Sequence, residues 1–267
     1  MTVTTAPAAL ATRARPTYSR LGTVGLALAA LAPLSIFTVG LASGATFGDV
    51  GFFGIVAAIG LAGAAAVWWL GTIGKILGIV ASVLVGGALF WTVFGLAYPA
   101  SVMDFVPGVL LPLGVVTGLG GSAAAIVAKR RGRTGATRAE TRIVTSVVAI
   151  AVLAVVASGI LSVTSRTSVE APAGAVTSEM RDFVFAEGTY TVAAGQPATI
   201  VVHNADPVTH DFTIPELGIS QVVLPGSDAA IEFAAPPGTY TIYCTLHSDT
   251  SVADPAQAGM AATLVAS

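Results

Sequence analysis

The residues best suited to chemistry gather near the end of the chain. The stretch Tyr243–Val265 (YCTLHSDTSVADPAQAGMAATLV) holds the only cysteine, Cys244, with His247 three positions later and Met260 beyond a polar insert. An earlier histidine, His210, stands in VTHDF. A thiolate and two imidazoles in one plane with a weak axial thioether suit copper, because soft sulfur favours Cu(I) and imidazole accommodates both oxidation states. The sequence therefore predicts one mononuclear copper site built from His210, Cys244, His247 and Met260.

The small supply of metal-binding side chains limits what this site can do. The chain has three histidines and one cysteine, whereas multinuclear copper enzymes need more imidazoles and a binuclear copper centre of the oxidase type needs two cysteines. We therefore expect a protein that carries an electron or binds a metal, and not an enzyme. The third histidine, His203, falls on the opposite strand face from Ile200 and Val202. We expect it to face solvent, with an accessory metal role as the alternative.

Short strands are expected around these ligands. From about Glu179 the hydrophobic pattern has a period of two, as in RDFVF and GTYTIYC, and turn signals such as NADP, LPGSD and APPG interrupt it. Seven or eight short strands with a turn every 8–12 residues are typical of an antiparallel sandwich. One cysteine cannot form a disulfide within this domain, so its core must stabilise it. The prediction is an all-β Greek-key sandwich over residues 179–267.

Three motifs in this domain resemble those of the cupredoxins, the plastocyanin-like blue-copper proteins. They are VVHNADPVTHDF, PPGTYTIYCTLH and GMAATLV, which occur in the family's order across Glu179–Ser267. The resemblance implies that His210, Cys244 and His247 hold one type 1 (blue) copper in the plane and that Met260 supplies the axial sulfur.

The sequence departs from the family pattern between the last two ligands. Twelve residues (SDTSVADPAQAG) separate His247 from Met260, where short-loop members have only a few. The axial bond is long and weak, so a longer loop can still return the sulfur to the metal. Two alternatives stay open: Gln257 or a main-chain oxygen is the axial ligand, or Met260 is only a core residue.

The first part of the chain has the composition of a membrane protein. The whole chain is 54% hydrophobic and 10% charged, against about 25% charged residues in soluble domains. Five uncharged apolar stretches are long enough to cross a bilayer, which takes about 20 residues. They predict a helical bundle over residues 21–163, followed by a linker over 164–178; the spans are Leu21–Ala42, Phe52–Leu70, Ile76–Tyr98, Phe105–Ala128 and Ile143–Val163.

The charged residues between the spans predict the orientation. The cations lie in residues 1–20 (Arg13, Arg15 and Arg20), at Lys75 and in the loop Lys129–Arg142, whereas the alternate loops carry only Asp49 and Asp104. By the positive-inside rule, residues 1–20 are cytoplasmic and the C-terminal domain lies outside the plasma membrane. The first span could instead be a cleaved signal peptide, but its length favours a retained anchor.

Two functions fit this plan. The first is a membrane-anchored type 1 copper protein that carries electrons on the extracytoplasmic face. Because 11 of the 14 Asp and Glu residues follow residue 165, a basic partner such as a c-type cytochrome fits, as does a membrane oxidase. The alternative is a module for copper acquisition, delivery or tolerance beside a copper transporter or assembly factor. A cupredoxin-like fold used only for protein interaction is the third possibility. No nucleic-acid partner is expected, and the role of the spans stays open.

Overall fold

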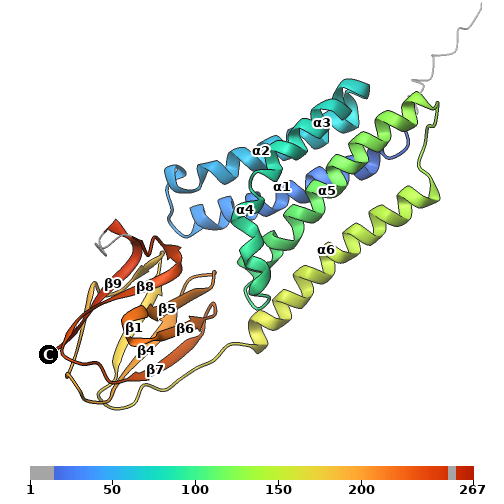
Figure 1. Ribbon diagram of the computed structural model, residues 1–267. Helices are drawn as coiled ribbons and strands as arrows, with labels where there is room; N and C mark the ends of the chain where they lie inside the picture. Colours follow the sequence, from blue (N-terminus) through green and yellow to red (C-terminus); the bar gives the residue numbers. More distant parts are fainter. Residues whose placement is uncertain (1–14, 252–256) are drawn as a thin grey trace, which may run out of the picture. The chain divides into compact units, whose positions relative to one another are not determined.

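The structure is a computed structural model that describes residues 15–251 and 257–267 (Figure 1). Residues 1–14, which include Arg13 and most of the predicted cytoplasmic segment, lie outside the described residues, as do residues 252–256 of the insert. Helices make up the first part of the chain and a β-sandwich makes up the last part. This confirms the predicted fold class, a helical bundle followed by an all-β domain.

Four helices in the described part of the chain are long and apolar enough to cross a membrane. They correspond to the first, second, fourth and fifth predicted spans. Their bounds are α1 Ser19–Ala42, α2 Phe47–Trp69, α5 Val102–Arg130 and α6 Arg138–Thr164.

The third predicted span, Ile76–Tyr98, is not one helix. It is divided into α3 (Gly71–Gly86), α4 (Leu89–Thr92) and the 3₁₀ turn η1 (Val93–Ala97). The first break falls at Gly86 and Gly87, and glycine is among the weakest helix formers. The Gly87 N–H donates to the Leu84 carbonyl and the Ala88 N–H donates to the Val85 carbonyl, which ends α3 in a tightened turn. Hydropathy alone does not register such a break.

Glycines bring α1 and α5 into direct main-chain contact. A Cβ added at Gly25 would lie 2.2 Å from the Gly118 nitrogen, and one at Gly114 would lie 2.3 Å from the Ala29 nitrogen. Small residues let helix backbones approach this closely in membranes, where van der Waals packing drives association. These glycines are therefore explained by helix packing.

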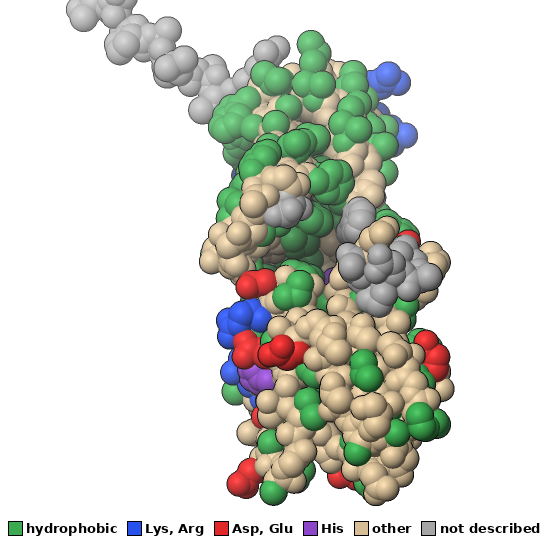
Figure 2. Space-filling view, turned by 90° about the vertical axis from the view of Figure 1, so that its left-hand side faces the viewer, with side chains coloured by type: hydrophobic (Ala, Val, Ile, Leu, Met, Phe, Trp, Pro, Cys, Tyr) green, Lys and Arg blue, Asp and Glu red, His purple; other side chains and the backbone are tan. Residues whose placement is uncertain are grey.

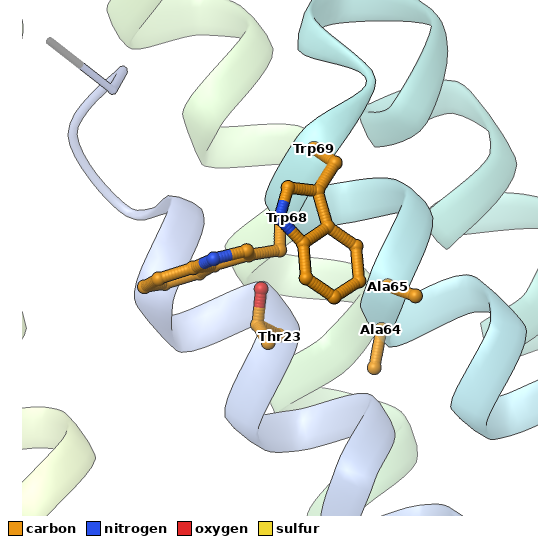
Figure 3. A pocket seen from close by; sticks show the side chains of 5 residues that line it. All are labelled: Thr23, Ala64, Ala65, Trp68 and Trp69. Carbon is orange, nitrogen blue, oxygen red and sulfur yellow. The ribbon is translucent and has the colours of Figure 1, made fainter. Parts of the chain in front are cut away.

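A shallow, open hollow of about 360 Å³ lies between α1 and the end of α2. Figure 3 shows it beside two adjacent tryptophans; its lining is Thr23, Ala64, Ala65, Trp68 and Trp69. The guanidinium of Arg15 lies 3.7 Å from the centre of the Trp68 ring, a cation–π contact. Lys75, expected between two spans, lies instead inside α3, because that helix begins at Gly71, almost directly after α2. Its side chain is buried and its Nζ donates to the Val67 carbonyl.

The β-sandwich is made of two sheets. One sheet has the order β2-β1-β4-β7 and the other β3-β9-β8-β5-β6. Nine strands are present in the described residues, with a 3₁₀ turn, η2 (Pro215–Leu217), after β5. The strands are β1 Val176–Arg181, β2 Val184–Phe185, β3 Thr189–Val192, β4 Ala198–Asn204, β5 His210–Ile214, β6 Ile219–Val223, β7 Asp228–Phe233, β8 Gly238–Ser248 and β9 Gly259–Ala266.

The sequence pattern predicts an antiparallel sandwich, but the observed sandwich also contains parallel strand pairs. The pairs β1·β4 and β3·β9 are parallel, and the other neighbours are antiparallel. The reason is the path of the chain, which passes from the first sheet to the second at β3, back at β4 and across again at β5. Two strands of one sheet that are joined through the other sheet can run in the same direction. An alternating pattern predicts a strand but does not identify its neighbour.

The core of the sandwich is formed by inward-facing residues of both sheets. Strands β1, β4, β5, β8 and β9 each contribute a fully buried apolar side chain: Met180, Ile200, Phe212, Ile242 and Leu264. Cys244 and Met260 belong to the same buried cluster. Two of the four predicted ligands are therefore fixed by the packing of the core.

The segment between α6 and β1 is attached to the sandwich. The Thr167 Oγ1 donates to the Asp228 carbonyl over 2.7 Å, and the Asp228 N–H donates back to the Thr167 carbonyl over 2.9 Å. The Val169 N–H donates to the Asp228 carboxylate, which also accepts from the His203 Nδ1 at 2.6 Å. His203 is thus a surface residue paired with Asp228, outside the predicted ligand set.

Candidate metal centre

Strands β5 and β8 bring three of the predicted ligands together. His210 begins β5, and Cys244 and His247 lie toward the end of β8, which pairs with β5. The Nδ1 atoms of His210 and His247 are 3.0 Å apart. The Cys244 Sγ lies 3.5 Å from the Nδ1 of His210 and 3.4 Å from that of His247. His210 and Cys244 are fully buried, and His247 is partly buried.

This triangle has the size required for one metal ion. A point equidistant from the three atoms lies about 1.9 Å from each, close to the roughly 2.0–2.3 Å of metal–nitrogen and metal–sulfur bonds at protein sites such as those of zinc. Two imidazoles and one thiolate in a plane are the donor set of type 1 copper, whereas a closed zinc site has four tetrahedral ligands. The cluster of His210, Cys244 and His247 fits a type 1 copper site.

Burial controls the protonation of the metal-free ligands. Burial and the Asp211 carboxylate together raise the pKa of the Cys244 thiol to about 12, although hydrogen bonds from the N–H groups of Asp211 and Leu246 partly oppose them. Burial also lowers the pKa of His247 to about 4, assisted by the neighbouring His210. At neutral pH the metal-free site therefore presents a neutral imidazole at His247 and a protonated thiol.

Asp211 connects the two ligand-bearing segments. It follows His210 in β5 and is 3% exposed. Its carboxylate accepts hydrogen bonds from the Thr245 Oγ1 at 2.9 Å and from the Leu246 N–H at 3.3 Å. Both donors lie between Cys244 and His247, so Asp211 fixes that segment relative to β5.

Asp206 contacts the outer nitrogen of His210. Its Oδ2 lies 2.8 Å from the His210 Nε2, the ring atom that faces away from the other ligands. The two oxygens also accept the N–H groups of Asp182 (2.8 Å) and Phe183 (3.0 Å). Burial raises the pKa of the Asp206 carboxyl, but the hydrogen bonds from His210 and from these two N–H groups outweigh it, so the pKa lies below the ordinary value.

An aromatic ring lies against both histidines. The centre of the Phe183 ring is 4.8 Å from that of His247 and 5.5 Å from that of His210, in edge-to-face arrangements. Phe183 is 48% exposed, so its outer side meets solvent. Phe183 therefore covers the two imidazoles on one side.

The insert between His247 and Met260 returns Met260 to the end of β8, where Cys244 and His247 lie. Ser248 pairs with Gly259, the Asp249 N–H donates to the Ala258 carbonyl, and the Ser248 Oγ donates to the Met260 carbonyl at 2.6 Å. The Met260 side chain is 1% exposed and packs in the same core cluster as Cys244, whereas Gln257 is exposed. This arrangement favours Met260 over Gln257, and its bond to the metal stays a prediction.

Three residues of the site were not predicted from the sequence: Asp206, Asp211 and Phe183. Two of them had a local signal, because Asp206 stands four residues before His210 in NADPVTH and Asp211 directly follows His210. Phe183 had none, because it lies 27 positions before His210.

The family comparison agrees with this geometry. Residues 147–253 match the family model described as the cupredoxin-like domain. The fold, the donor set and the family match together define a cupredoxin-like domain whose ligand cluster fits copper. The chain thus joins helices that can cross a membrane to a cupredoxin-like domain. The match begins within α6 and ends before β9, and no curated protein matches the chain.

Solved structures similar to this chain include copper proteins. Reduced auracyanin from Roseiflexus castenholzii is 19% identical, with 37% of this chain and 99% of that chain covered and a TM-score of 0.28. The metal-binding domain of the Cu(I)-exporting P-type ATPase CopA of Streptococcus pneumoniae D39 is 16% identical (38% and 93% covered, TM-score 0.29). Amicyanin from Paracoccus versutus is 16% identical, with 38% of this chain and 90% of that chain covered and a TM-score of 0.29. At these scores the copper assignment rests on the family match and the site geometry.

Proposed function

We propose that this protein is a membrane-anchored type 1 copper protein that carries electrons on the extracytoplasmic face of the plasma membrane. The observation that carries the proposal is the convergence of His210, Cys244 and His247, whose ligand atoms all lie within 4.8 Å of one another. Copper held there would supply one-electron chemistry by cycling between Cu(I) and Cu(II).

The protein's own residues are suited to that task. Cys244 and Met260 pack in the core, and Asp211 fixes the end of β8, which carries His247. Ligands held by rigid elements cannot rearrange freely when the charge of the site changes. Small rearrangement favours fast electron transfer over substrate turnover, so we do not propose an enzyme.

The distribution of charge supports the location and the partner. Basic residues flank the apolar helices at Arg15, Arg20 and Lys129–Arg142, which favours a cytoplasmic position for that end. The sandwich carries most of the acidic residues, and Figure 2 shows Asp and Glu side chains on its surface. A basic redox protein such as a c-type cytochrome, or a membrane oxidase with a basic face, would be attracted to such a domain.

A redox measurement on the full chain in detergent separates this proposal from copper delivery. An electron carrier should show a reversible potential, rapid self-exchange and copper that stays bound when an apo-acceptor is added. Slow self-exchange together with transfer of Cu(I) to the acceptor would favour a role in acquisition, delivery or tolerance.

The topology is tested separately. In intact spheroplasts, protease should remove a C-terminal tag from outside, while a cysteine introduced at Thr134 should resist impermeant thiol reagents. Labelling of that loop from outside would overturn the orientation.

A further inference from the structure

The hydrogen bond between Asp206 and His210 fixes which ring nitrogen of His210 faces the other ligands. An ionised carboxylate only accepts hydrogen bonds, so the His210 Nε2 must donate. In the neutral ring this leaves a lone pair on Nδ1, the atom that lies 3.0 Å from the His247 Nδ1 and 3.5 Å from the Cys244 Sγ. Both partners are buried, with His210 at 0% and Asp206 at 6% exposure.

The same carboxylate holds a turn of unusual backbone conformation. Asp182 and Phe183 are consecutive residues at φ +57° and +60°, in the left-handed region that non-glycine residues seldom adopt. Such residues are strained and persist only where the surroundings hold them. Here their two N–H groups both donate to Asp206, and the turn places Phe183 against the rings of His210 and His247.

The main chain at Asp206 is held in place by Asn204. The Asn204 Oδ1 accepts the Asp206 N–H at 3.0 Å, and its Nδ2 donates to the Val208 carbonyl (2.9 Å) and the Val223 carbonyl (2.8 Å). Asn204 is fully buried. The loop between β4 and β5 is thus fixed before any metal is bound.

We propose that Asp206 is a positioning residue of the metal site with two tasks. It orients the His210 imidazole and increases its donor strength, and it keeps the Phe183 ring over both imidazoles. This inference rests on the proposed copper site. It adds a residue that tunes the reduction potential of the copper.

The two tasks have effects of opposite sign on the reduction potential. A carboxylate on the outer N–H makes an imidazole a stronger donor, which stabilises Cu(II) more than Cu(I). The apolar cover limits access of water, and water would stabilise the higher charge of Cu(II). Removing the hydrogen bond should therefore raise the potential, and removing the cover alone should lower it.

The variants Asp206→Asn and Phe183→Ala in the full chain separate these effects. For Asp206→Asn we expect the Cu(II) dissociation constant to rise by about tenfold. If the Cu(I) affinity changes little, the potential rises by about 59 mV for that tenfold change in a one-electron couple. For Phe183→Ala the potential should fall. Because Asp206 also holds the turn that carries Phe183, the donor role is tested in the Phe183→Ala background. The double variant Asp206→Asn/Phe183→Ala should have a higher potential than Phe183→Ala, and equal potentials would overturn the donor role.

The matched control is Asp228→Asn. Asp228 accepts a 2.6 Å hydrogen bond from His203, so it forms the same kind of pair outside the ligand cluster. This variant should leave the potential unchanged, and an equal rise in both Asp→Asn variants would show a general charge effect in place of positioning.

A measurement without copper keeps the inference separate from the proposed function. NMR of the imidazole nitrogens in the metal-free chain should show the His210 Nε2-bound proton, slow to exchange, in the wild type and in Phe183→Ala. In Asp206→Asn this proton should exchange faster, because a neutral amide oxygen is a weaker acceptor than a carboxylate. If the proton is absent from the wild type, the hydrogen bond itself is wrong. If the proton is present but copper gives no thiolate band, the proposed function fails. A normal band with equal potentials in Phe183→Ala and in the double variant removes only the role of Asp206.

Discussion

Gly259 packs directly against the main-chain oxygen of His247. A Cβ at Gly259 would come within 2.8 Å of that oxygen, and the glycine adopts φ +94°. Strand β9, which carries Met260, can therefore approach the end of β8, which carries His247, only if residue 259 lacks a side chain. The GM pair that opens the last strand thus has a steric cause.

Gly259→Ala should damage both stability and the metal site. The positive φ is costly for alanine, by about 1–3 kcal/mol of unfolding free energy, and the contact should displace His247. Urea unfolding and a copper titration of the full chain in detergent would measure the two effects. Gly188→Ala is the control, because a Cβ added at Gly188 would meet open space. This variant should change the unfolding free energy by less than about 0.5 kcal/mol. Equal behaviour of the two variants would refute the steric explanation.

Met260→Leu tests the axial ligand. The thiolate-to-copper band should persist, since Cys244, His210 and His247 supply it, while the potential should rise because a soft axial donor is replaced by an apolar group. If Met260 is only a core residue, this volume-conserving change would cost less than about 1.5 kcal/mol of stability and leave the potential where it was. A shift in Gln257→Ala with none in Met260→Leu would make Gln257 the axial ligand.

Binding of a metal to Cys244 should release a proton. Because the pKa of the metal-free thiol is raised to about 12, the thiol is protonated at pH 7.5 and must lose its proton to become a ligand. His247, with its pKa lowered to about 4, is already neutral and releases none. Calorimetry of Cu(I) binding under anaerobic conditions, in buffers of different ionisation enthalpy, should give about one proton per copper. A value near zero would mean that the thiol is already ionised.

The attached linker should stabilise the sandwich. The test compares two fragments, 165–267 and 176–267. Only the longer fragment contains Thr167 and Val169, which form hydrogen bonds with Ser227 and Asp228. These partly exposed hydrogen bonds are expected to add about 1–2 kcal/mol to the unfolding free energy of the longer fragment. Equal urea midpoints for the two fragments would show that the attachment contributes nothing.

The sequence was most informative where the signal is local. Cys244 and His247 share one short motif at the end of a strand, and apolar length alone located four of the spans. Contacts that depend on tertiary structure were not foreseen. The turn at Asp182 and Phe183 has positive φ without a glycine to mark it, so nothing in the sequence indicated that Phe183 would reach the histidines. The parallel strand pairs likewise follow from a chain path that alternation along a strand does not encode.

The most direct test of the account is a copper titration of the full chain, followed by visible absorption and electron paramagnetic resonance. We predict one Cu(II) per chain, an intense thiolate-to-copper band and the narrow hyperfine splitting of a type 1 site, with band and splitting both lost in Cys244→Ser. A wild-type spectrum without the band, or one that Cys244→Ser leaves unchanged, would contradict the assignment of this metal centre.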